Sequence, residues 1–369
     1  MGYKKDCKLF NGYKPCSFKR HCDGCPHYEK SGQRVLLISL EAMGAVLRST
    51  CLLHPIKREY PNAHITWLTM KASKPLLMEN HLIDRILTYD ASTLPILDHL
   101  EFDVCFVVDK SMLAGSLAHR VKAPIKRGFG LTPLGAITPL NPEAQYQYDV
   151  GLDDDLKFYK NQKPETQQIT ESLAMAYKQD PYVLDFSSQE KATIKERRAS
   201  LLSNHKGVIG FSTGCSTLYP YKKFTVEQSI RVIAAWRKEF KDHVVAIYGG
   251  PEDTERNAAI YEAFNQDPMV INTPTKEGLR SGLMWMATAD MILSGCSLGL
   301  HIAIALQKKI VTWFGVSCSQ EIDLYGLGVK LQAEVSCSPC WKKSCDKEPK
   351  CYDKVSTSSI MAATKEVLS

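Results

Sequence analysis

Short apolar runs alternate with amphipathic stretches along most of this chain. In the first half, the short apolar runs have the length and composition of buried parallel strands. After the first run, the sequence predicts a glycine-containing turn and then a helix that ends at about Arg58. The predicted strands are RVLLISL (34–40), AHITWLTM (63–70), LIDRILTYD (82–90, with its lead-in) and FDVCFVVDK (102–110), the last ending on Asp109. The pattern indicates an α/β domain with a parallel sheet.

The alternation stops between about Gly151 and Pro181, where the chain is too polar to form a core, and then resumes. The second series contains strands at HKGVIGFST, HVVAIYGG, ADMILSG and KKIVTWFG, with helices at TVEQSIRVIAAWRKEF and from PEDTERN. We therefore expect a Cys-rich segment at 1–30, Rossmann-like domains at 31–180 and 181–335, and a Cys-rich segment with a C-terminal helix at 336–369. Parallel sheets present ligands at the carboxyl ends of their strands, so a cleft between the two domains is the expected ligand site.

Composition narrows the classes of partner. A formal charge of +6 is small for 369 residues, and basic and acidic residues are interspersed, so we expect no nucleic-acid binding. Mild basicity suits an anionic ligand such as a nucleoside diphosphate, or a peripheral approach to an anionic inner-membrane surface. The beginning, MGYKKDCKLF, has no secretory signal, and no apolar run is long enough to span a bilayer, so we expect a cytoplasmic protein.

Three loops carry candidate ligand-binding residues. Ser212, Thr213 and Gly214 follow a strand where backbone N–H groups can meet an anion, with Lys222 close behind; the alternative for Lys222 is a solvated surface lysine. Two glycines ending at Gly250 allow close approach of a ligand.

Further along these loops, Glu252 can accept ribose hydroxyls, or it and Asp253 simply favour a helix N-terminus. Ser297 can cap a helix at whose first turn lies His301, which either contacts a ligand or packs in the interior.

Eight of the thirteen cysteines form two clusters, which suit tetrahedral sites for structural zinc; the clusters are Cys7, Cys16, Cys22 and Cys25, and Cys337, Cys340, Cys345 and Cys351. An iron–sulfur cluster, paired disulfides and free thiols remain alternatives. The other cysteines are expected to be small core residues, except Cys215 and Cys296, which their positions place toward the ligand. No histidine or acid is placed by sequence to activate either as a nucleophile.

Four motifs in order resemble the heptosyltransferase family, glycosyltransferase family nine, which has the GT-B fold. LEAMGAVLRSTCLLHPIKREYPNAHITWLT resembles its opening loop and helix, GFSTGCSTLYPYKKF its phosphate loop, IYGGPEDTERN its ribose loop, and SGCSLGLHIAIAL its last helix entry. CSPCWKKSCDKEPKC is similar to a segment near the end of many members, and CDGCPHY to an N-terminal extension of some. The resemblance extends over roughly Arg34 to Leu368.

The resemblance implies a nucleotide-sugar donor similar to ADP-heptose, with Lys222 on its phosphates and no divalent metal needed for catalysis. The implied donor-binding residues are Ser212, Thr213, Gly214, Cys215, Lys222, Gly250, Glu252, Ser297, Leu298, Gly299 and His301.

Two positions depart from the family pattern. Ala45 stands where the family has its aspartate base, and a methyl group cannot accept a proton. Cys296 stands where an aspartate usually precedes Ser or Thr, and a thiol supplies no charge at neutral pH unless its pKa is depressed. Glu41 and Asp109 are the candidate substitutes for the missing base.

The resulting hypothesis is an inverting glycosyltransferase that transfers a heptose to a lipopolysaccharide-core or other cell-envelope glycan acceptor, with activity altered or impaired by Ala45. The alternative is a sugar-nucleotide-binding or glycan-binding protein that has lost transfer. A Rossmann-type dehydrogenase is a third option, which the absence of G-x-G-x-x-G after the first strand disfavours.

Overall fold

The computed structural model describes residues 2–202 and 205–369, which divide into two compact units. Unit 1 comprises Met1–Leu152 with Thr166–Asp180, and unit 2 comprises Asp153–Glu165 with Pro181–Ser369. Asp153–Glu165 thus groups with the second unit, although it lies inside the range that the sequence suggested for the first domain.

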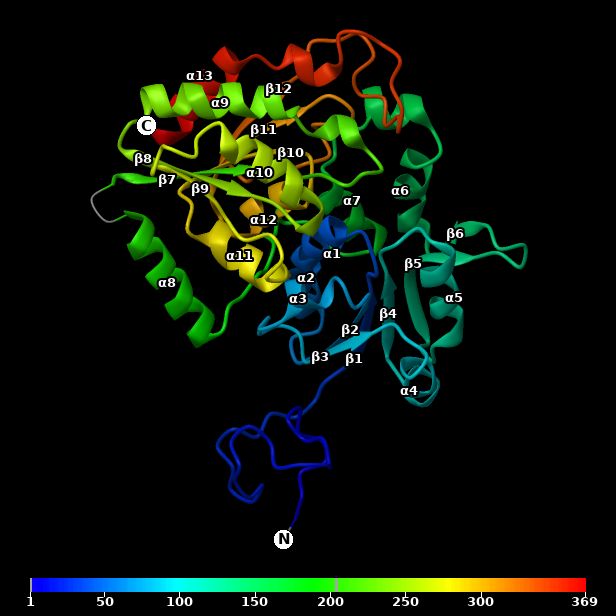
Figure 1. Ribbon diagram of the computed structural model, residues 1–369. Helices are drawn as coiled ribbons and strands as arrows, with labels where there is room; N and C mark the ends of the chain where they lie inside the picture. Colours follow the sequence, from blue (N-terminus) through cyan, green and yellow to red (C-terminus); the bar gives the residue numbers. More distant parts are fainter. Residues whose placement is uncertain (1, 203–204) are drawn as a thin grey trace. The chain divides into compact units, whose positions relative to one another are not determined.

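Unit 1 contains a six-stranded sheet in the order β3-β2-β1-β4-β5-β6, in which only the β5–β6 pair is antiparallel (Figure 1). Its strands are β1 Arg34–Ile38, β2 His64–Thr69, β3 Arg85–Thr88, β4 Val104–Val107, β5 Ile125–Leu131 and β6 Ile137–Pro139. Its helices are α1 Met43–Ser49, α2 Leu53–Glu59, α3 Lys74–Leu77, α4 Thr93–His99, α5 Met112–Arg120 and α6 Gln145–Val150, with short turns η1 Thr50–Leu52 and η2 Pro142–Ala144. Helix α7, Glu165–Ser172, lies almost wholly in this unit.

The central strands of unit 1 are buried on both faces. Val104–Val107 of β4 is buried throughout, and alternate residues of β1, Leu36 and Ile38, pack with Leu117 of α5. Side chains alternate across a strand, so a continuous apolar run requires helices on both faces of the sheet. The α/β pattern predicted from the sequence is confirmed.

Unit 2 contains a six-stranded, fully parallel sheet in the order β12-β11-β10-β7-β8-β9. Its strands are β7 Gly207–Ser212, β8 His243–Tyr248, β9 Val270–Asn272, β10 Met291–Gly295, β11 Lys309–Phe314 and β12 Gly328–Gln332. Its helices are α8 Ser188–Leu202, α9 Val226–Glu239, α10 Thr254–Glu262, α11 Leu279–Ala287, α12 Leu298–Ala305 and α13 Thr357–Leu368; η4 Pro220–Lys222, η5 Pro251–Asp253 and η6 Cys351–Lys354 are 3-10 turns, and η3 Leu156–Lys160 is a single π-helical turn.

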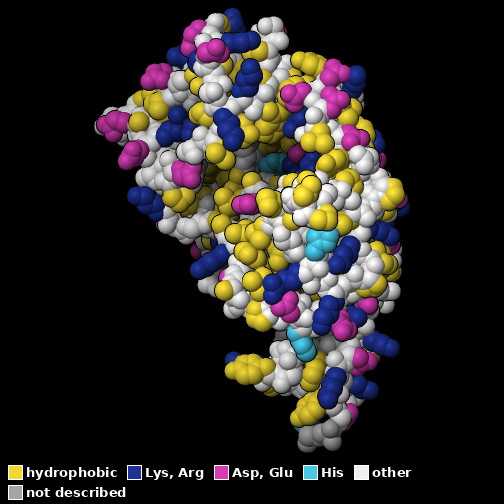
Figure 2. All heavy atoms as spheres, turned by 90° about the vertical axis from the view of Figure 1, so that its right-hand side faces the viewer, with side chains coloured by type: hydrophobic (Ala, Val, Ile, Leu, Met, Phe, Trp, Pro, Cys, Tyr) yellow, Lys and Arg dark blue, Asp and Glu magenta, His cyan; other side chains and the backbone are white. Residues whose placement is uncertain are grey.

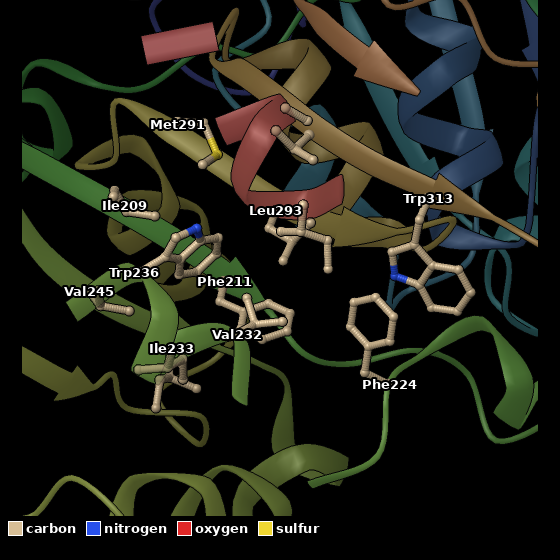
Figure 3. Packing of buried hydrophobic residues seen from close by; sticks show 14 of the residues in the cluster. Ile209, Phe211, Phe224, Val232, Ile233, Trp236, Val245, Met291, Leu293 and Trp313 are labelled. Carbon is tan, nitrogen blue, oxygen red and sulfur yellow. The ribbon is translucent and has the colours of Figure 1, made fainter. Parts of the chain in front are cut away.

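The core of unit 2 is a cluster of aromatic and branched side chains (Figure 3). Trp236 of α9 meets Phe211 of β7 edge to face at 5.8 Å between ring centroids, and Phe224 stacks on Trp313 at 4.6 Å. Helix α9 starts with a capping box, in which Thr225 and Gln228 each accept the other's backbone N–H. The core therefore fixes the strand ends from which the loops of the candidate site emerge.

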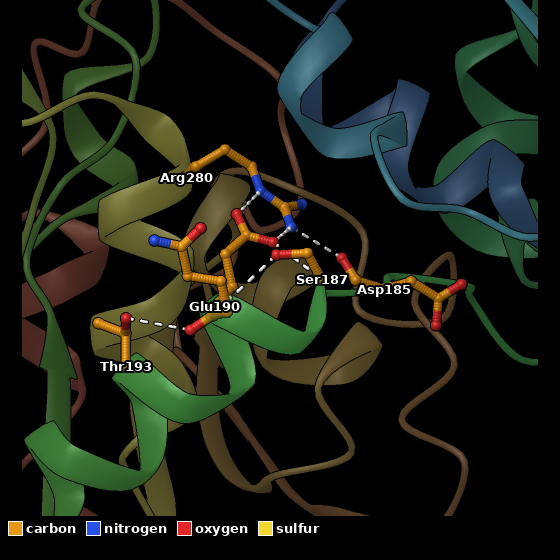
Figure 4. A network of polar contacts seen from close by, with 6 residues as sticks. Asp185, Ser187, Glu190, Thr193 and Arg280 are labelled. Atoms are coloured by element: carbon orange, nitrogen blue, oxygen red, sulfur yellow. Dashed lines mark hydrogen bonds and ion pairs between the residues drawn. The ribbon is translucent and has the colours of Figure 1, made fainter. Parts of the chain in front are cut away.

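Helix α8 is held to α11 by a polar network. The Arg280 guanidinium donates to both carboxylate oxygens of Glu190, at 2.7 and 2.5 Å, and to the carbonyl of Asp185 (Figure 4). This pairing is the largest cause that lowers the pKa of Glu190 to about 2. A bidentate, half-buried pair of this kind orients a helix that buries few apolar side chains.

The charged residues that are interspersed along the sequence are also mixed on the surface. On the face shown in Figure 2, basic and acidic side chains are intermixed. Among the residues that the structure describes, no helix has the length and apolar character needed to cross a bilayer.

Candidate donor-binding site and acceptor-side carboxylate

The glycine loop after β7 turns its side chains inward. Thr213 donates its N–H to the carbonyl of Tyr248 at 3.2 Å and its hydroxyl to Asn257 at 2.5 Å, and both Ser212 and Thr213 are buried. A Cβ on Gly214 would lie 2.1 Å from a carboxylate oxygen of Asp253, so only glycine fits there. Ser212 and Thr213 therefore shape the loop, and only its backbone is free to meet a ligand.

The loop after β8 is tied to the glycine loop by Asp253, which the sequence had suggested only as a helix-favouring acid. Its carboxylate accepts the N–H of Gly250 at 2.9 Å, and its side chain is buried against Gly214. The neighbouring Glu252 is exposed. The two acids thus differ in their surroundings. Asp253 connects the two loops, and Glu252 is accessible to a ligand. The signal that could have found this was the position of Asp253 three residues after Gly250, where a side chain caps the turn.

Lys222 ends η4 and is only 9% exposed, yet it faces rings instead of carboxylates. Its Nζ lies 3.9 Å from the ring centroid of Trp341 and 4.8 Å from that of Tyr219. No ion pair to Lys222 occurs within the described ranges. Burying a cation without a countercharge is unfavourable, and contact with aromatic faces offsets only part of that cost. The site therefore favours an anion beside Lys222, and the solvated-lysine alternative is wrong.

The C-terminal Cys-rich segment holds the turn that ends at Lys222. Tyr352 stacks on Tyr221 at 6.4 Å, and the thiol of Cys351 contacts the carbonyl of Tyr221 at 3.8 Å. Trp341 comes from the same segment. No local pattern along the chain indicates this contact, because more than a hundred residues separate the two segments.

Among the residues it describes, the structure does not show the metal sites that the cysteine clusters predict, although it brings one cluster to a common cavity. No disulfide joins any of the thirteen cysteines, all of which lie in the described ranges. Four of them line a cavity of about 270 Å³ with Tyr221 and Lys350, namely Cys337, Cys340, Cys345 and Cys351. Of the residues the structure describes, no three His, Cys, Asp or Glu side chains are grouped so as to hold a metal ion.

The N-terminal set, Cys7, Cys16, Cys22 and Cys25, is half-buried along an irregular segment. A zinc site needs four ligands about 2.0 to 2.3 Å from one point, and spacing along the chain does not ensure that convergence. The structure therefore does not support the zinc prediction.

The third loop is built by packing and capping. Ser297 accepts the N–H of Gly299 at 3.2 Å, which caps α12, and a Cβ on Gly299 would lie 2.1 Å from the hydroxyl oxygen of Ser212. His301 is buried, with Nδ1 3.3 Å from the hydroxyl of Tyr182 and its ring stacked on that tyrosine. His301 thus packs against Tyr182, and Leu298, at the start of the same helix, is half-buried; contact of either with a ligand stays a prediction.

Neither cysteine near these loops is activated. Burial is the largest cause that raises the pKa of Cys215 to about 11, and burial likewise raises the pKa of Cys296. Both thiols stay protonated at neutral pH, so Cys296 does not supply the charge of the aspartate that the family resemblance implies at this position.

In unit 1, Asp109 follows β4 and holds the loop that leads to Ala45. Its carboxylate accepts the N–H of Leu40 and, at 3.4 Å, that of Glu41. Burial is the largest cause that raises its pKa to about 6. Glu41 itself is exposed on the loop, and Ala45 lies in the first turn of α1. Asp109 therefore has both a fixed position and a pKa near that of a working base.

Comparisons with known proteins agree with this arrangement. The family model for glycosyltransferase family 9 (heptosyltransferase) matches residues 144–354, more than half of the chain. No curated protein sequence matches it.

Three solved structures are similar to this chain. A family 9 glycosyl transferase from Veillonella parvula is 17% identical, with a TM-score of 0.69 over 92% of this chain and 98% of that one. E. coli ADP-heptose lps heptosyltransferase II is 18% identical, with a TM-score of 0.66 over 91% and 98%. E. coli heptosyltransferase WaaC with ADP is 14% identical, with a TM-score of 0.63 over 90% and 99%. These likenesses establish the GT-B fold, and with the family match they show that the chain belongs to glycosyltransferase family 9, the heptosyltransferase family.

Proposed function

We propose that this chain transfers a heptose, with inversion, from an ADP-linked donor to a cell-envelope glycan acceptor. The observation that carries the proposal is Lys222, a buried cation set against two aromatic rings and without a carboxylate partner in the described parts of the chain. A fixed positive charge stabilises the diphosphate that departs when the sugar is transferred. Such a charge makes a divalent metal unnecessary for this step.

The donor's remaining contacts follow from the loops. Glu252 is exposed beside Gly250, where a carboxylate can accept the two ribose hydroxyls. Gly214 and Gly250 let backbone approach the nucleotide closely. One structure similar to this chain is described with ADP, which supports adenine as the base of the donor.

We assign the base to Asp109. Inverting transfer needs a group that takes the acceptor's hydroxyl proton as the anomeric carbon is attacked, and general bases contribute typically ~10²- to 10⁴-fold. Asp109 is held at the end of β4, next to the loop where the family's base would stand, with a pKa raised to about 6. Glu41 has no comparable anchoring contact through its side chain in the described structure.

Two measurements test the proposal together. Isothermal titration with ADP should show binding that Lys222→Met weakens and Lys223→Met, one residue later, does not. Release of ADP from ADP-heptose in the presence of a lipopolysaccharide-core acceptor should show turnover. Absence of ADP binding by the unmodified chain would overturn the donor assignment.

A binding protein without transferase activity is the second candidate. The methyl side chain of Ala45 cannot accept a proton, and the thiol of Cys296 stays neutral. Donor binding without nucleotide release would select this alternative. Activity gained by Ala45→Asp would show that only the base was missing, whereas no gain would indicate a changed acceptor site.

Location and metal content are predictions of the same proposal. We place the chain in the cytoplasm, at the inner-membrane surface, because the proposed acceptor is a glycolipid or other envelope glycan and the formal charge is +6. Co-sedimentation with vesicles containing anionic lipid tests this, and equal recovery with neutral vesicles would contradict it. Zinc binding by the cysteines stays a prediction that elemental analysis of the purified chain can settle.

A further inference from the structure

Trp341 is in contact with two lysines from distant parts of unit 2. The Nζ of Lys222 lies 3.9 Å from its ring centroid, and the Nζ of Lys157 lies 4.6 Å from the same centroid. Neither lysine has an ion pair within the described ranges, whereas Lys160, in the same helical turn as Lys157, pairs with Asp155 at 2.5 Å. The turn that carries Lys157 thus pairs one of its lysines with a carboxylate and directs the other to the indole.

Both partners of this contact are anchored through their backbones. Lys157 lies in the segment Asp153–Glu165, which groups with unit 2. Its backbone carbonyl accepts a hydrogen bond from the side-chain N–H of Gln320 at 3.3 Å. Trp341 donates its N–H to the carbonyl of Val316 at 2.9 Å and has φ of 49°, in the left-handed region. A bulky residue adopts that conformation only where its surroundings impose it, and such residues cluster at functional sites.

The cluster is electrostatically incomplete. Two ammonium groups close to one ring repel each other, and in a partly buried place this repulsion is screened less than at an open surface. The ring face of Trp341 attracts both cations and that of Tyr219 attracts Lys222, but neither ring supplies a net negative charge. A ligand with two or more negative charges would remove the repulsion and satisfy both lysines.

We propose that Lys157 and Lys222 together bind the diphosphate of a nucleotide sugar, and that Trp341 of the Cys-rich segment is the positioning residue for both ammonium groups. The proposal rests on the function proposed above, since it takes the diphosphate to lie at Lys222. It extends the donor site to a lysine of the inter-domain segment and gives the Cys-rich segment a role in binding.

The test uses the full chain and isothermal titration with ADP, inorganic diphosphate and adenosine. Charge-assisted hydrogen bonds contribute enough that Lys157→Met should weaken ADP and inorganic diphosphate binding by roughly 10- to 100-fold. It should also reduce the dependence of affinity on salt, and leave adenosine binding unchanged. Lys160→Met is the matched control, because that lysine is in the same turn but already paired, and it should bind all three probes as the unmodified chain does.

Trp341→Leu tests the positioning role. It should weaken ADP binding in the unmodified chain but have no further effect in the Lys157→Met/Lys222→Met background, because a residue that acts through two others loses its effect when they are removed. Trp341→Phe, which keeps an aromatic face, should recover part of the affinity. Thermal unfolding of each variant checks that the fold is kept.

The outcomes separate the two proposals. Weakening by Lys222→Met without weakening by Lys157→Met overturns this inference and leaves the proposed function standing. Equal loss on Trp341→Leu in both backgrounds overturns the positioning role. Absence of ADP and diphosphate binding by the unmodified chain overturns the proposed function and this inference with it.

Discussion

Replacing Asp109 by Asn separates the catalytic from the structural role of this carboxylate. The amide keeps the size of the side chain and one oxygen, so it can still accept the N–H of Leu40 that holds the loop after β1. It cannot accept a proton from the acceptor hydroxyl. Loss of a general base predicts a fall in kcat of ~10²- to 10⁴-fold.

The same substitution has a stability effect whose sign follows from the raised pKa. Because the pKa of Asp109 is about 6 in the folded chain against 3.8 ordinarily, the folded state binds more protons than the unfolded state between these values. The contribution of the protonated Asp109 to the free energy of unfolding is therefore fully present below pH 3.8, and it is lost as the pH rises through 6. The ionised carboxylate then costs up to about 3 kcal/mol, which Asp109→Asn removes at pH 8 but not at pH 4.

Two assays read these effects. Denaturant unfolding at pH 8 and pH 4 should show the variant more stable at pH 8 by up to about 3 kcal/mol and equal at pH 4. Nucleotide release by the unmodified chain should decline as pH falls below about 6, as Asp109 becomes protonated. Glu41→Gln is the matched control, because it removes the competing carboxylate of the same loop. It should leave turnover unchanged and lower the pKa of Asp109 only slightly, since the Glu41 charge is the last of the causes that shift this pKa.

A different result would refute this reasoning. If Asp109→Asn retains turnover and Glu41→Gln loses it, the base is Glu41 and Asp109 only holds the loop. If Asp109→Asn is less stable than the unmodified chain at pH 8, burial of the carboxylate is not the dominant cost.

Three further changes test the donor half. Glu252→Gln should weaken ADP binding about tenfold, the low end for a charged hydrogen bond, and leave inorganic diphosphate binding unchanged in titrations; equal loss on both probes would contradict a ribose contact. Gly299→Ala should lower the free energy of unfolding by ~1 to 3 kcal/mol, because its Cβ would lie 2.1 Å from the hydroxyl oxygen of Ser212, and an unchanged denaturant midpoint would contradict that packing. Glu190→Gln should lower the free energy of unfolding at pH 7. Because pairing with Arg280 depresses the pKa of Glu190, the difference in stability between the variant and the unmodified chain should narrow as pH falls below 4.5 toward 2. A difference in chemical unfolding that does not change with pH would show that charge is not the cause.

The elements that sequence predicted well are those whose apolar run is continuous. β1, β4, β7 and β8 were expected at the residues where they occur, because strands buried on both faces carry a strong local signal. β5, with the sequence IKRGFGL, and the edge strand β12, with GVKLQ, were not expected, since glycines, charged residues and half-burial weaken that signal. Helix α8 buries none of its residues, so its sequence has no apolar periodicity from which the helix could be predicted.

The loops that follow the strands were also determined by the sequence. A glycine and an acid or lysine within eight residues follow each of two strands, so their order along the chain located Gly214 and Lys222, and Gly250 and Glu252, after strand ends. The family resemblance and the GT-B fold followed from the same local order, and both are confirmed.

Only the tertiary structure decided what surrounds these residues. Asp253 joins two loops, and Trp341 and Lys157 approach Lys222 from segments far away in the sequence. The cysteine spacing suggested metal sites, and only the fold shows that the four C-terminal cysteines line one cavity without forming a recognisable metal-ligand group in the described residues. Burial, which raised the pKa of Asp109, is likewise a property of packing. The sequence determined where the strands end and which residues lie in the loops that follow them, and long-range contacts decided the charge state, the partners and the exposure of those residues.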